Sequence, residues 1–565
     1  MQKIWQATEY DASTADQLQK ELNIHPVFCQ LLAQRGISSF QEAEQFFRPK
    51  ISDLHDPFLM KGMEKAATRV LQAIDNQEKV LIYGDYDADG VTSVSLLYSF
   101  LAPLVKSLDY YIPDRYKEGY GLSYEGVEFA YQAKVDLLIT VDCGITATAQ
   151  IKLVKYYNID CIICDHHLPE KTLPLADAIL DPKQIDCNYP YKELSGCGIA
   201  FKLAQGINQK LERPFQYCKD LLDLVAISTA ADIVEMRGEN RVLMYYGLKQ
   251  LNNTKRVGLK MLLQMSGREM PLNVSDIVFG IAPLINAAGR LADAKQAVKL
   301  LLAKDKNAAA DLSHLLQLRN KMRQEFDQRI AQEAKELFEQ QENWQEKNSI
   351  VLYQKHWHKG VVGIVASRMV DQYYRPSIIL TESNDQVVGS ARSIKGIDIH
   401  AALHHCADLL VNFGGHQHAA GLKMQIENLP FFQDRIEAYV STHLKKEEKL
   451  PRISYHAQLD FKDITPTFWN ILQQFAPFGP GNRNPVFVTK AVIDTGYSRI
   501  LKGEHLKFSV KQKDSSTLSG IGFGLGKKYE LMQGKQSVNL CYNLQLNKWK
   551  GKRSIQLVVK DLKSS

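Results

Sequence analysis

Three aspartates alternate with other residues in the segment YGDYDADG, which spans residues 83–90. Asp85, Asp87 and Asp89 lie within five residues, and a glycine on either side allows the backbone to turn around them. Carboxylates this close repel one another, and a divalent cation bound between them removes the repulsion. A calcium-binding EF-hand is the alternative, but its loop requires a bidentate glutamate at position 12, where this chain has Leu96. The spacing therefore favours a divalent-cation site of another kind.

Two further apolar stretches end in residues that bind metals. LITV is followed by Asp142, and CIIC is followed by Asp165, His166 and His167. The carboxyl ends of parallel strands meet at one edge of a sheet, where open α/β sheets bind their ligands. Asp142 alone could be a helix cap. Acidic or imidazole residues after three strands instead predict one shared site at that edge.

Cys161 and Cys164 precede these histidines in CIICDHH and suggest a zinc site or a thiol redox pair. Both alternatives conflict with a strand, because side chains at i and i+3 point to opposite faces and cannot bind one ion. A redox pair would need the thiols at a helix N-terminus. We expect both cysteines to behave as small core residues and the chemistry to belong to the Asp-His-His step.

The elements that must position these residues alternate between strand and helix. Continuous β-branched runs separated by helical stretches predict a parallel sheet covered on both faces. Further helices are expected over roughly residues 198–290. The predicted strands are KVLIY (79–83), SLDYYIP (107–113), VDLLITV (135–141), IDCIIC (159–164) and ADAIL (176–180).

The rest of the chain changes character twice. Residues 290–359 contain neither Gly nor Pro, and 310–341 has the pattern of one long connecting helix. A second α/β unit follows over about 348–440, and then about five short strands suggest a small barrel such as the OB-fold. We therefore expect an α/β multidomain chain, divided into a helical lead-in (1–75), a parallel-sheet catalytic domain (76–290), a helical connector (291–342), a substrate-binding α/β domain (343–445) and an all-β barrel (451–565).

Composition narrows the function. The 565 residues are enough for three or four domains. Residues 451–565 contain 18 Lys and Arg and 7 Asp and Glu, a net charge of +11, whereas the rest of the chain has a net charge of −5. This asymmetry predicts that the barrel binds a polyanion. Nine scattered cysteines suit a reducing cytoplasm. No run of 18 apolar residues and no hydrophobic signal segment is found, so neither a membrane protein nor a secreted one is expected.

The ordered motifs resemble those of the DHH phosphoesterase superfamily over about residues 50–565. The complete set is similar to the bacterial single-strand-specific exonucleases within it. The motifs are YGDYDADG, TVDCG, DHH, STAADIV, INAAGRL, WHKGVVGIVASR, GSARS, GGHQHAAG and FAPFGPGNRNPVF.

This resemblance implies a hydrolase with two divalent ions, Mn²⁺ or Mg²⁺, that removes nucleotides from the 5′ end of single-stranded DNA in repair and recombination. His167 would contact the scissile phosphate, and Asp85 would be a further ligand or a supporting acid. Smaller members often have His where this chain has Tyr83, which leaves one ligand set open. Carboxylates and imidazole suit Mn²⁺. The implied metal ligands are Asp87, Asp89, Asp142, His166 and Asp232.

The second α/β unit resembles the DHHA1 domain, which binds the nucleic-acid end. The matching residues are Arg290, Ser390, Arg392 and His416, and Arg115 in IPDRYKEGYG is a further expected contact with the 5′ phosphate. In the barrel, basic residues surround Trp549, which could stack on a base.

Two other functions remain open at this point. One is a phosphodiesterase of short oligonucleotides or cyclic dinucleotides, which would not need a basic barrel. The other is an inactive scaffold that only binds DNA, which should have lost its acidic positions. The resemblance also implies a single-strand-binding protein and a RecQ-type helicase as partners.

Overall fold

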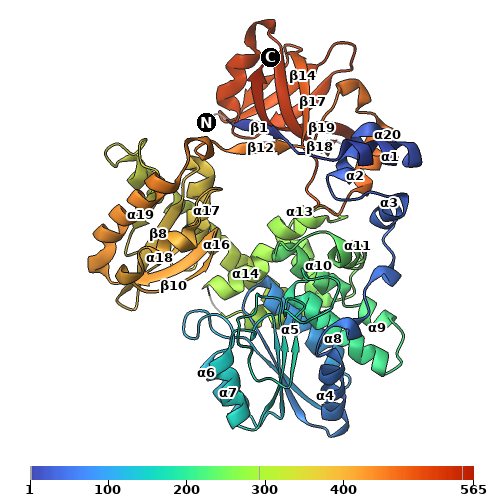
Figure 1. The fold of residues 1–565 in the computed structure, drawn as a ribbon, viewed down its shortest axis with the longest axis vertical. Helices are drawn as coiled ribbons and strands as arrows, with labels where there is room; N and C mark the ends of the chain where they lie inside the picture. Colours follow the sequence, from blue (N-terminus) through green and yellow to red (C-terminus); the bar gives the residue numbers. More distant parts are fainter. Residues whose placement is uncertain (1–2, 292, 550) are drawn as a thin grey trace.

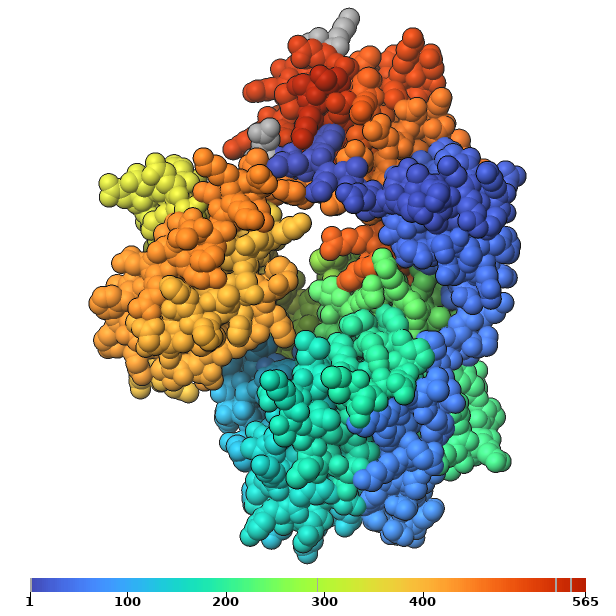
Figure 2. Space-filling model, in the orientation of Figure 1, coloured from blue at the N-terminus to red at the C-terminus, as the bar shows by residue number. Residues whose placement is uncertain are grey.

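The computed structural model describes residues 3–291, 293–549 and 551–565, without the side chains of 534, 535 and 549. Three folded units surround an open space, which Figure 2 shows in a space-filling view. In Figure 1 the parallel-sheet unit lies at the bottom, the second α/β unit at the left and the barrel at the top.

The first unit contains a five-stranded sheet in the order β3-β2-β4-β5-β6, and every pairing in it is parallel. Helices α5 (Ala88–Leu101) and α8 (Gly196–Lys210) pack against each other on one face, and α6 (Tyr124–Gln132) and α7 (Thr148–Tyr156) pack together beside the sheet. The expected doubly covered parallel sheet is confirmed. The strands are β2 (Lys79–Gly84), β3 (Ser107–Tyr111), β4 (Leu137–Val141), β5 (Asp160–Cys164) and β6 (Ala178–Leu180).

The two cysteines of β5 lie on opposite faces of this sheet. Cys164 belongs to the large core that contains α5 and α8, whereas Cys161 belongs to the smaller core beneath α6 and α7. Both are fully buried and free. The strand argument against a shared zinc ion or a redox pair is therefore confirmed.

Helices complete this unit and lead out of it. They include α10 (Leu222–Ala231), α11 (Gly238–Asn252), α12 (Val257–Met265) and α14 (Ala282–Leu291). Among the described residues, one helical stretch, Val274–Leu291, is long and apolar enough to cross a membrane. Just over half of it, 56%, is buried within the fold, as in the core helix of a folded domain.

The connector is one helix, α16 (Lys306–Glu339), which begins at an N-cap formed by Asp305 and reaches the second α/β unit. That unit has the strand order β10-β11-β9-β8-β7, in which only β7 and β8 are parallel. Helix α17 (Val362–Tyr373) packs on β8 and β9. Its strands are β7 (Ile350–Tyr353), β8 (Ser377–Ser383), β9 (Gln386–Arg392), β10 (Leu410–His416) and β11 (Ala419–Met424).

The C-terminal unit is a curved sheet in the order β13-β14-β18-β19-β17-β16-β15, and a further β14–β16 pairing closes it into a barrel. It therefore has more strands than the five expected. The long hairpin of β18 (Val538–Trp549) and β19 (Lys552–Ser564) is its largest element. The other strands are β13 (Ala457–Gln458), β14 (Phe487–Asp494), β15 (Arg499–Leu501), β16 (His505–Lys511) and β17 (Leu518–Gly522).

The segment 1–75 does not form one unit. Helices α1 (Ala12–Leu22), α2 (Pro26–Ala33) and α3 (Phe40–Phe47) share a hydrophobic core with the barrel and α20 (Pro466–Gln474). Strand β1 (Ile4–Ala7) pairs in parallel with β12 (Arg452–Tyr455). By contrast, α4 (Met63–Asp75) packs on α8 and β6 of the first unit.

Candidate metal centre and terminal-phosphate cleft

The carboxyl edge of the first sheet gathers the acidic and imidazole residues. Asp85 follows β2, Asp142 follows β4, and Asp165, His166 and His167 follow β5. Because the strands are parallel and in register, their ends bring these residues together. Helix α10 contributes Asp232, which is its C-cap residue.

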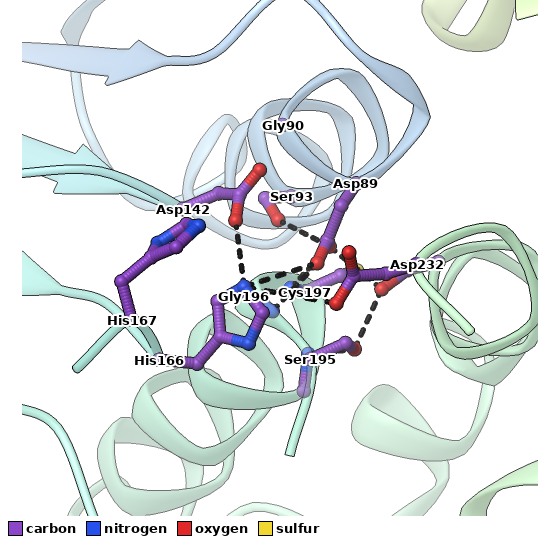
Figure 3. A network of polar contacts seen from close by, with 12 residues as sticks. Asp89, Gly90, Ser93, Asp142, His166, His167, Ser195, Gly196, Cys197 and Asp232 are labelled. Atoms are coloured by element: carbon purple, nitrogen blue, oxygen red, sulfur yellow. Dashed lines mark hydrogen bonds and ion pairs between the residues drawn. The ribbon is translucent and has the colours of Figure 1, made fainter. Parts of the chain in front are cut away.

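His166 lies at the middle of this group (Figure 3). Its Nε2 is 3.1 Å from Oδ1 of Asp142 and 3.8 Å from Oδ2 of both Asp89 and Asp232. Two triplets of potential ligand atoms result, each with its atoms within 4.8 Å of one another. One is Asp142, His166 and His167, and the other is Asp89, His166 and Asp232. Two adjacent triplets that share an imidazole form an arrangement suited to a pair of cations.

Asp89 is held by the beginning of α8. Its Oδ2 accepts a hydrogen bond from the backbone N–H of Gly196 at 2.8 Å, and its Oδ1 accepts one from Cys197 at 2.8 Å. The hydroxyl of Ser228, on α10, also donates to Oδ1 at 2.7 Å. These donors fix the carboxylate before any ligand binds and leave it directed at His166.

Asp142 approaches α8 so closely that only glycine fits opposite it. A Cβ added at Gly196 would lie 2.5 Å from Oδ1 of Asp142 and 2.6 Å from its Cβ. Asp142 itself has a left-handed backbone conformation, with φ at 59°. Such a conformation is uncommon for a residue other than glycine, although aspartate adopts it more readily than most.

Asp85 and Asp87 are not part of either triplet. Asp87 is the N-cap of α5, and its Oδ1 accepts hydrogen bonds from the N–H groups of Asp89 and Gly90. Both carboxylate oxygens of Asp85 are buried without a hydrogen-bond partner among the described residues. A buried carboxylate without donors is costly, and a nearby cation is a physical way to stabilise it.

The electrostatics of the centre favour bound cations. Burial and the neighbouring carboxylate of Asp89 raise the pKa of Asp142 well above its usual range and that of Asp232 to about 8. Burial and Asp87 raise the pKa of Asp85 in the same way. A positive ion among these groups would reverse such shifts, because opposite charge favours the ionised form. Burial also lowers the pKa of His166, which favours the neutral imidazole that metals bind.

His167 has different partners from His166. Its Nδ1 is 2.7 Å from Oδ1 of Asp165, and its Nε2 is 2.9 Å from the hydroxyl of Tyr120. Burial opposes protonation, but the hydrogen bond to Asp165 raises the pKa of His167 to about 9. Asp165 also accepts a hydrogen bond from the N–H of Ile145 at 2.9 Å, so it fixes the orientation of the ring.

A cleft of about 780 Å³ extends from this edge to the second α/β unit. Arg115 and Arg290 line it from the first unit, and Ser390 and Arg392 line it from β9. Arg392 donates to the hydroxyl of Ser390 at 2.8 Å, and Arg290 donates to the carbonyl of Gly360 at 3.2 Å. None of the three guanidinium groups has a carboxylate within 4.0 Å in the part of the chain that the structure describes. Lys117, Lys359 and Lys423 also line the cleft, against one acidic residue, Glu118, so the cleft carries a strong net positive charge.

The other two expected substrate contacts lie elsewhere. His416 ends β10, one residue beyond Gly415, which lines the cleft. Trp549 is at the tip of the β18–β19 hairpin, paired with Lys552, and its side chain lies outside the described residues.

Sequence reasoning missed several residues of the centre. Tyr120, Gly196 and Ser228 bear directly on the candidate ligands. The sequence places Asp165 with the strand-end acids but does not indicate the side chain that it contacts. A signal for Gly196 existed in the SGCG step, because glycines at a helix start commonly mark a close approach.

Comparison with known proteins agrees with this geometry. Family models described as the DHH family N-terminal domain, the DHHA1 domain and the RecJ OB domain match residues 79–229, 346–442 and 455–561. The single-stranded-DNA-specific exonuclease RecJ of Bacillus subtilis (strain 168) is 38% identical over 99% of this chain and 70% of its own. RecJ of Escherichia coli (strain K12) is 33% identical over 95% of this chain and 96% of its own.

A solved structure extends the comparison to three dimensions. The crystal structure of RecJ in complex with Mn²⁺ from Thermus thermophilus matches with a TM-score of 0.84 and 28% identity. The match covers 100% of this chain and 80% of that one, and a Mg²⁺ complex from the same organism matches with a TM-score of 0.79. The chain belongs to the RecJ family of DHH proteins.

Proposed function

We propose that this protein is a metal-dependent exonuclease that degrades single-stranded DNA from its 5′ end to mononucleotides, using two Mn²⁺ or Mg²⁺ ions. One observation carries the proposal: a cluster of carboxylates around His166 adjoins, through the Tyr120–His167 contact, a cleft whose three arginines have no carboxylate within 4.0 Å among the described residues. The first feature suits phosphodiester hydrolysis, and the second suits recognition of a terminal phosphate.

The residues of the centre have distinct roles in this proposal. Asp89, Asp142, His166 and Asp232 would hold the ions, with Asp87 and Asp85 completing the acidic environment. Two such ions, when bound, activate water and neutralise charge on the phosphate oxygens. The serine and backbone donors around Asp89 keep its carboxylate from rotating, so the ligand set is organised in advance.

His167 would contact the scissile phosphate, so Asp142 and His166 would hold the ion of the first triplet without it. Asp165 fixes the ring of His167 through Nδ1, so Nε2 is the atom left to face the substrate. In the structure the Tyr120 hydroxyl is within hydrogen-bond distance of that nitrogen. Tyr120 is exposed and belongs to the same chain segment as Arg115. A phosphate oxygen could take the place of the tyrosine hydroxyl as the partner of Nε2.

The direction of degradation requires a group that recognises an end, because a metal centre hydrolyses any phosphodiester that it can reach. Arg115, Arg290, Ser390 and Arg392 converge on one cleft and are the groups that we assign to the 5′ phosphate. Burial lowers the pKa of Arg392, which reflects the cost of a buried charge without a partner. A dianionic terminal phosphate would supply the missing counter-charge.

The test is single-turnover degradation of 5′- and 3′-labelled oligonucleotides, with and without a 5′ phosphate. Arg392→Ala should slow cleavage of the phosphorylated strand by about 10- to 150-fold, because a charge-assisted hydrogen bond contributes about 1.5–3 kcal/mol. Arg435→Ala is the matched control, since Arg435 lies in the same unit but is paired with Asp408. If Arg392→Ala keeps the full preference for a 5′ phosphate, the assignment of the cleft is wrong.

Single-stranded DNA is the polymer that this proposal requires, and the basic barrel is the element expected to hold it. A single-strand-binding protein and a RecQ-type helicase as partners, and a place in the cytoplasm, rest on the resemblance of the sequence and on nine free cysteines. Retention of all the acidic positions favours this function over an inactive scaffold, and the additional barrel favours it over a phosphodiesterase of small substrates.

A further inference from the structure

The motif FAPFGPGNRNPVF contains a segment that contacts the catalytic unit. This docking segment, residues 475–482, follows α20 and precedes β14. The backbone N–H of Met236 donates to the carbonyl of Pro480 at 2.7 Å, and Nε of Arg237 donates to the carbonyl of Gly481 at 2.8 Å. Met236 is four residues beyond Asp232, so the docking segment meets the chain close to a candidate metal ligand.

Two glycines of the docking segment lie where an added side chain would press on this contact. A Cβ at Gly479 would lie 3.0 Å from Cβ of Met236. Gly481 has a φ of +72°, and a Cβ there would lie 2.7 Å from Cγ of Glu235. An added methyl group at Gly481 would therefore meet both a strained backbone and a close neighbour.

Arg241, on α11, anchors the same interface. Its guanidinium donates to carbonyls of residues 474–477, at the C-terminal end of α20, and to the carbonyl of Phe46 at the end of α3. Cations are favoured at helix C-termini, where carbonyls lack partners. Arg241 is only 4% exposed, and burial lowers its pKa to about 9. One side chain of the catalytic unit therefore joins the barrel and the N-terminal helices to it.

The N-terminal helices hold the docking segment from the other side. Nε of Arg35 donates to Oδ1 of Asn482 at 2.6 Å, and Asn482 is fully buried. Nδ2 of Asn482 in turn donates to the carbonyls of Phe475 and Pro477. The docking segment is rigid because its turns are bonded internally and on both sides.

The link between this interface and the metal centre is a strained residue. Ile233 directly follows Asp232 and has a φ of 58°, a conformation that is an outlier for a β-branched side chain. Glycine or asparagine usually occupies such a position after a helix. Ile233 as a whole residue is also 62% exposed, so core packing does not explain the choice of isoleucine. Strain of this kind persists only where the surroundings determine the backbone.

We propose that the docking segment positions Asp232 for metal binding, with Ile233 as the stiff link between the two. Helix α10 fixes Asp232 on one side, and the hydrogen bonds of Met236 and Arg237 to the docking segment fix the chain on the other. The barrel thus supports the catalytic centre in addition to holding DNA. This inference rests on the proposed function, because it gives Asp232 a metal to bind.

The test compares two glycine-to-alanine substitutions in the full-length protein. Gly481→Ala adds a Cβ against Glu235, whereas Gly503→Ala introduces alanine at nearly the same φ, +73°, with no atom within 4 Å. Calorimetric titration with Mn²⁺ should show a dissociation constant at least tenfold higher for Gly481→Ala, the usual scale for loss of support behind a ligand. Gly503→Ala should match the wild type. At saturating Mn²⁺ the cleavage rate of Gly481→Ala should recover, and its affinity for single-stranded DNA should be unchanged.

Ile233→Gly is the second variant, because it removes strain and cannot fail by misfolding of the core. Ile233→Gly should keep or raise the thermal stability and yet weaken Mn²⁺ binding, because a flexible backbone at residue 233 no longer lets the docking segment position Asp232. Ile233→Val should bind Mn²⁺ as the wild type does. Unchanged Mn²⁺ affinity in folded Gly481→Ala and Ile233→Gly, or an equal loss in Gly503→Ala, would overturn the inference. Absence of Mn²⁺ binding and cleavage in the wild type would instead refute the proposed function.

Discussion

Gly196→Ala should inactivate the enzyme without unfolding it. The added Cβ would lie 2.5 Å from Oδ1 of Asp142, whereas ordinary van der Waals contact begins at 3.4 Å. Asp142 must therefore move by about 1 Å, and a displacement of that size in a catalytic group costs about 100-fold in rate. The overpacked site should also lower the free energy of unfolding by about 1–3 kcal/mol.

Gly198→Ala is the matched control for this substitution. Gly198 lies in the same first turn of α8, is equally buried, and a Cβ there would lie 3.3 Å from Leu194. Single-turnover cleavage of a 5′-phosphorylated oligonucleotide, DNA affinity and thermal unfolding should be measured for both variants. A Gly196→Ala protein that cleaves within about threefold of the wild-type rate would refute the close approach of Asp142 to α8.

Three further substitutions test how buried cysteines, a buried ion pair and a half-buried histidine contribute to the free energy of unfolding. Joint replacement of Cys161 and Cys164 by Ala should leave metal content unchanged and lower the free energy of unfolding by about 1–2 kcal/mol; loss of one metal equivalent would contradict the strand geometry. Lys202→Met leaves Glu239 buried and unpaired, so urea unfolding should show a loss of about 3–5 kcal/mol, and an unchanged midpoint would argue against the pair. Burial lowers the pKa of His456 from its usual 6.5 to about 4, so the unfolded chain binds this proton more readily. The contribution of neutral His456 to the free energy of unfolding should therefore be fully present above pH 6.5 and should fall by about 2–4 kcal/mol as the pH drops to 4. Denaturation measured across this pH range should show a smaller pH dependence for His456→Gln than for the wild type.

The sequence was sufficient for the sheet and the edge that carries the chemistry. Apolar runs between helices predict parallel strands, and parallel strands place their final residues together. Asp142 and His166 could therefore be assigned to one site before the structure was known, and their atoms lie 3.1 Å apart. The spacing of apolar residues and the order of the strands along the chain are properties of the sequence itself, so they can be recognised without a structure.

The helical part of the centre could not be predicted in this way. Asp232 ends an apolar helix, and nothing in that pattern shows which strand edge the helix end faces; only the family resemblance selected it. The role of Asp165 was hidden for a related reason, because its position at a strand end is equivalent to that of Asp142. The direction of its side chain toward His167 depends on the turn that follows β5.

The docking of the N-terminal helices on the barrel was equally inaccessible. Phe28 of α2 lies 4.4 Å from Phe468 and 5.8 Å from Phe475, ring centroid to centroid, although hundreds of residues of chain separate them. An apolar helix face predicts that the helix packs on another element of the fold, but it does not identify that element. For this reason the sequence predicts one lead-in over residues 1–75, whereas its helices divide between two cores.

The arrangement of charges explains why an end-specific enzyme needs both halves of the cleft. Arg290 is buried beside Arg115, and burial with this like charge lowers its pKa to about 10. Like charges gathered in a partly buried site repel one another in the free protein, and an anionic ligand would compensate for that cost. An internal phosphodiester carries one negative charge and is flanked by sugars on both sides, whereas a terminal phosphate carries up to two and has one free side. In the proposed function the cleft would therefore receive the terminal phosphate, and the acidic centre at the sheet edge would cleave the strand that the cleft has positioned.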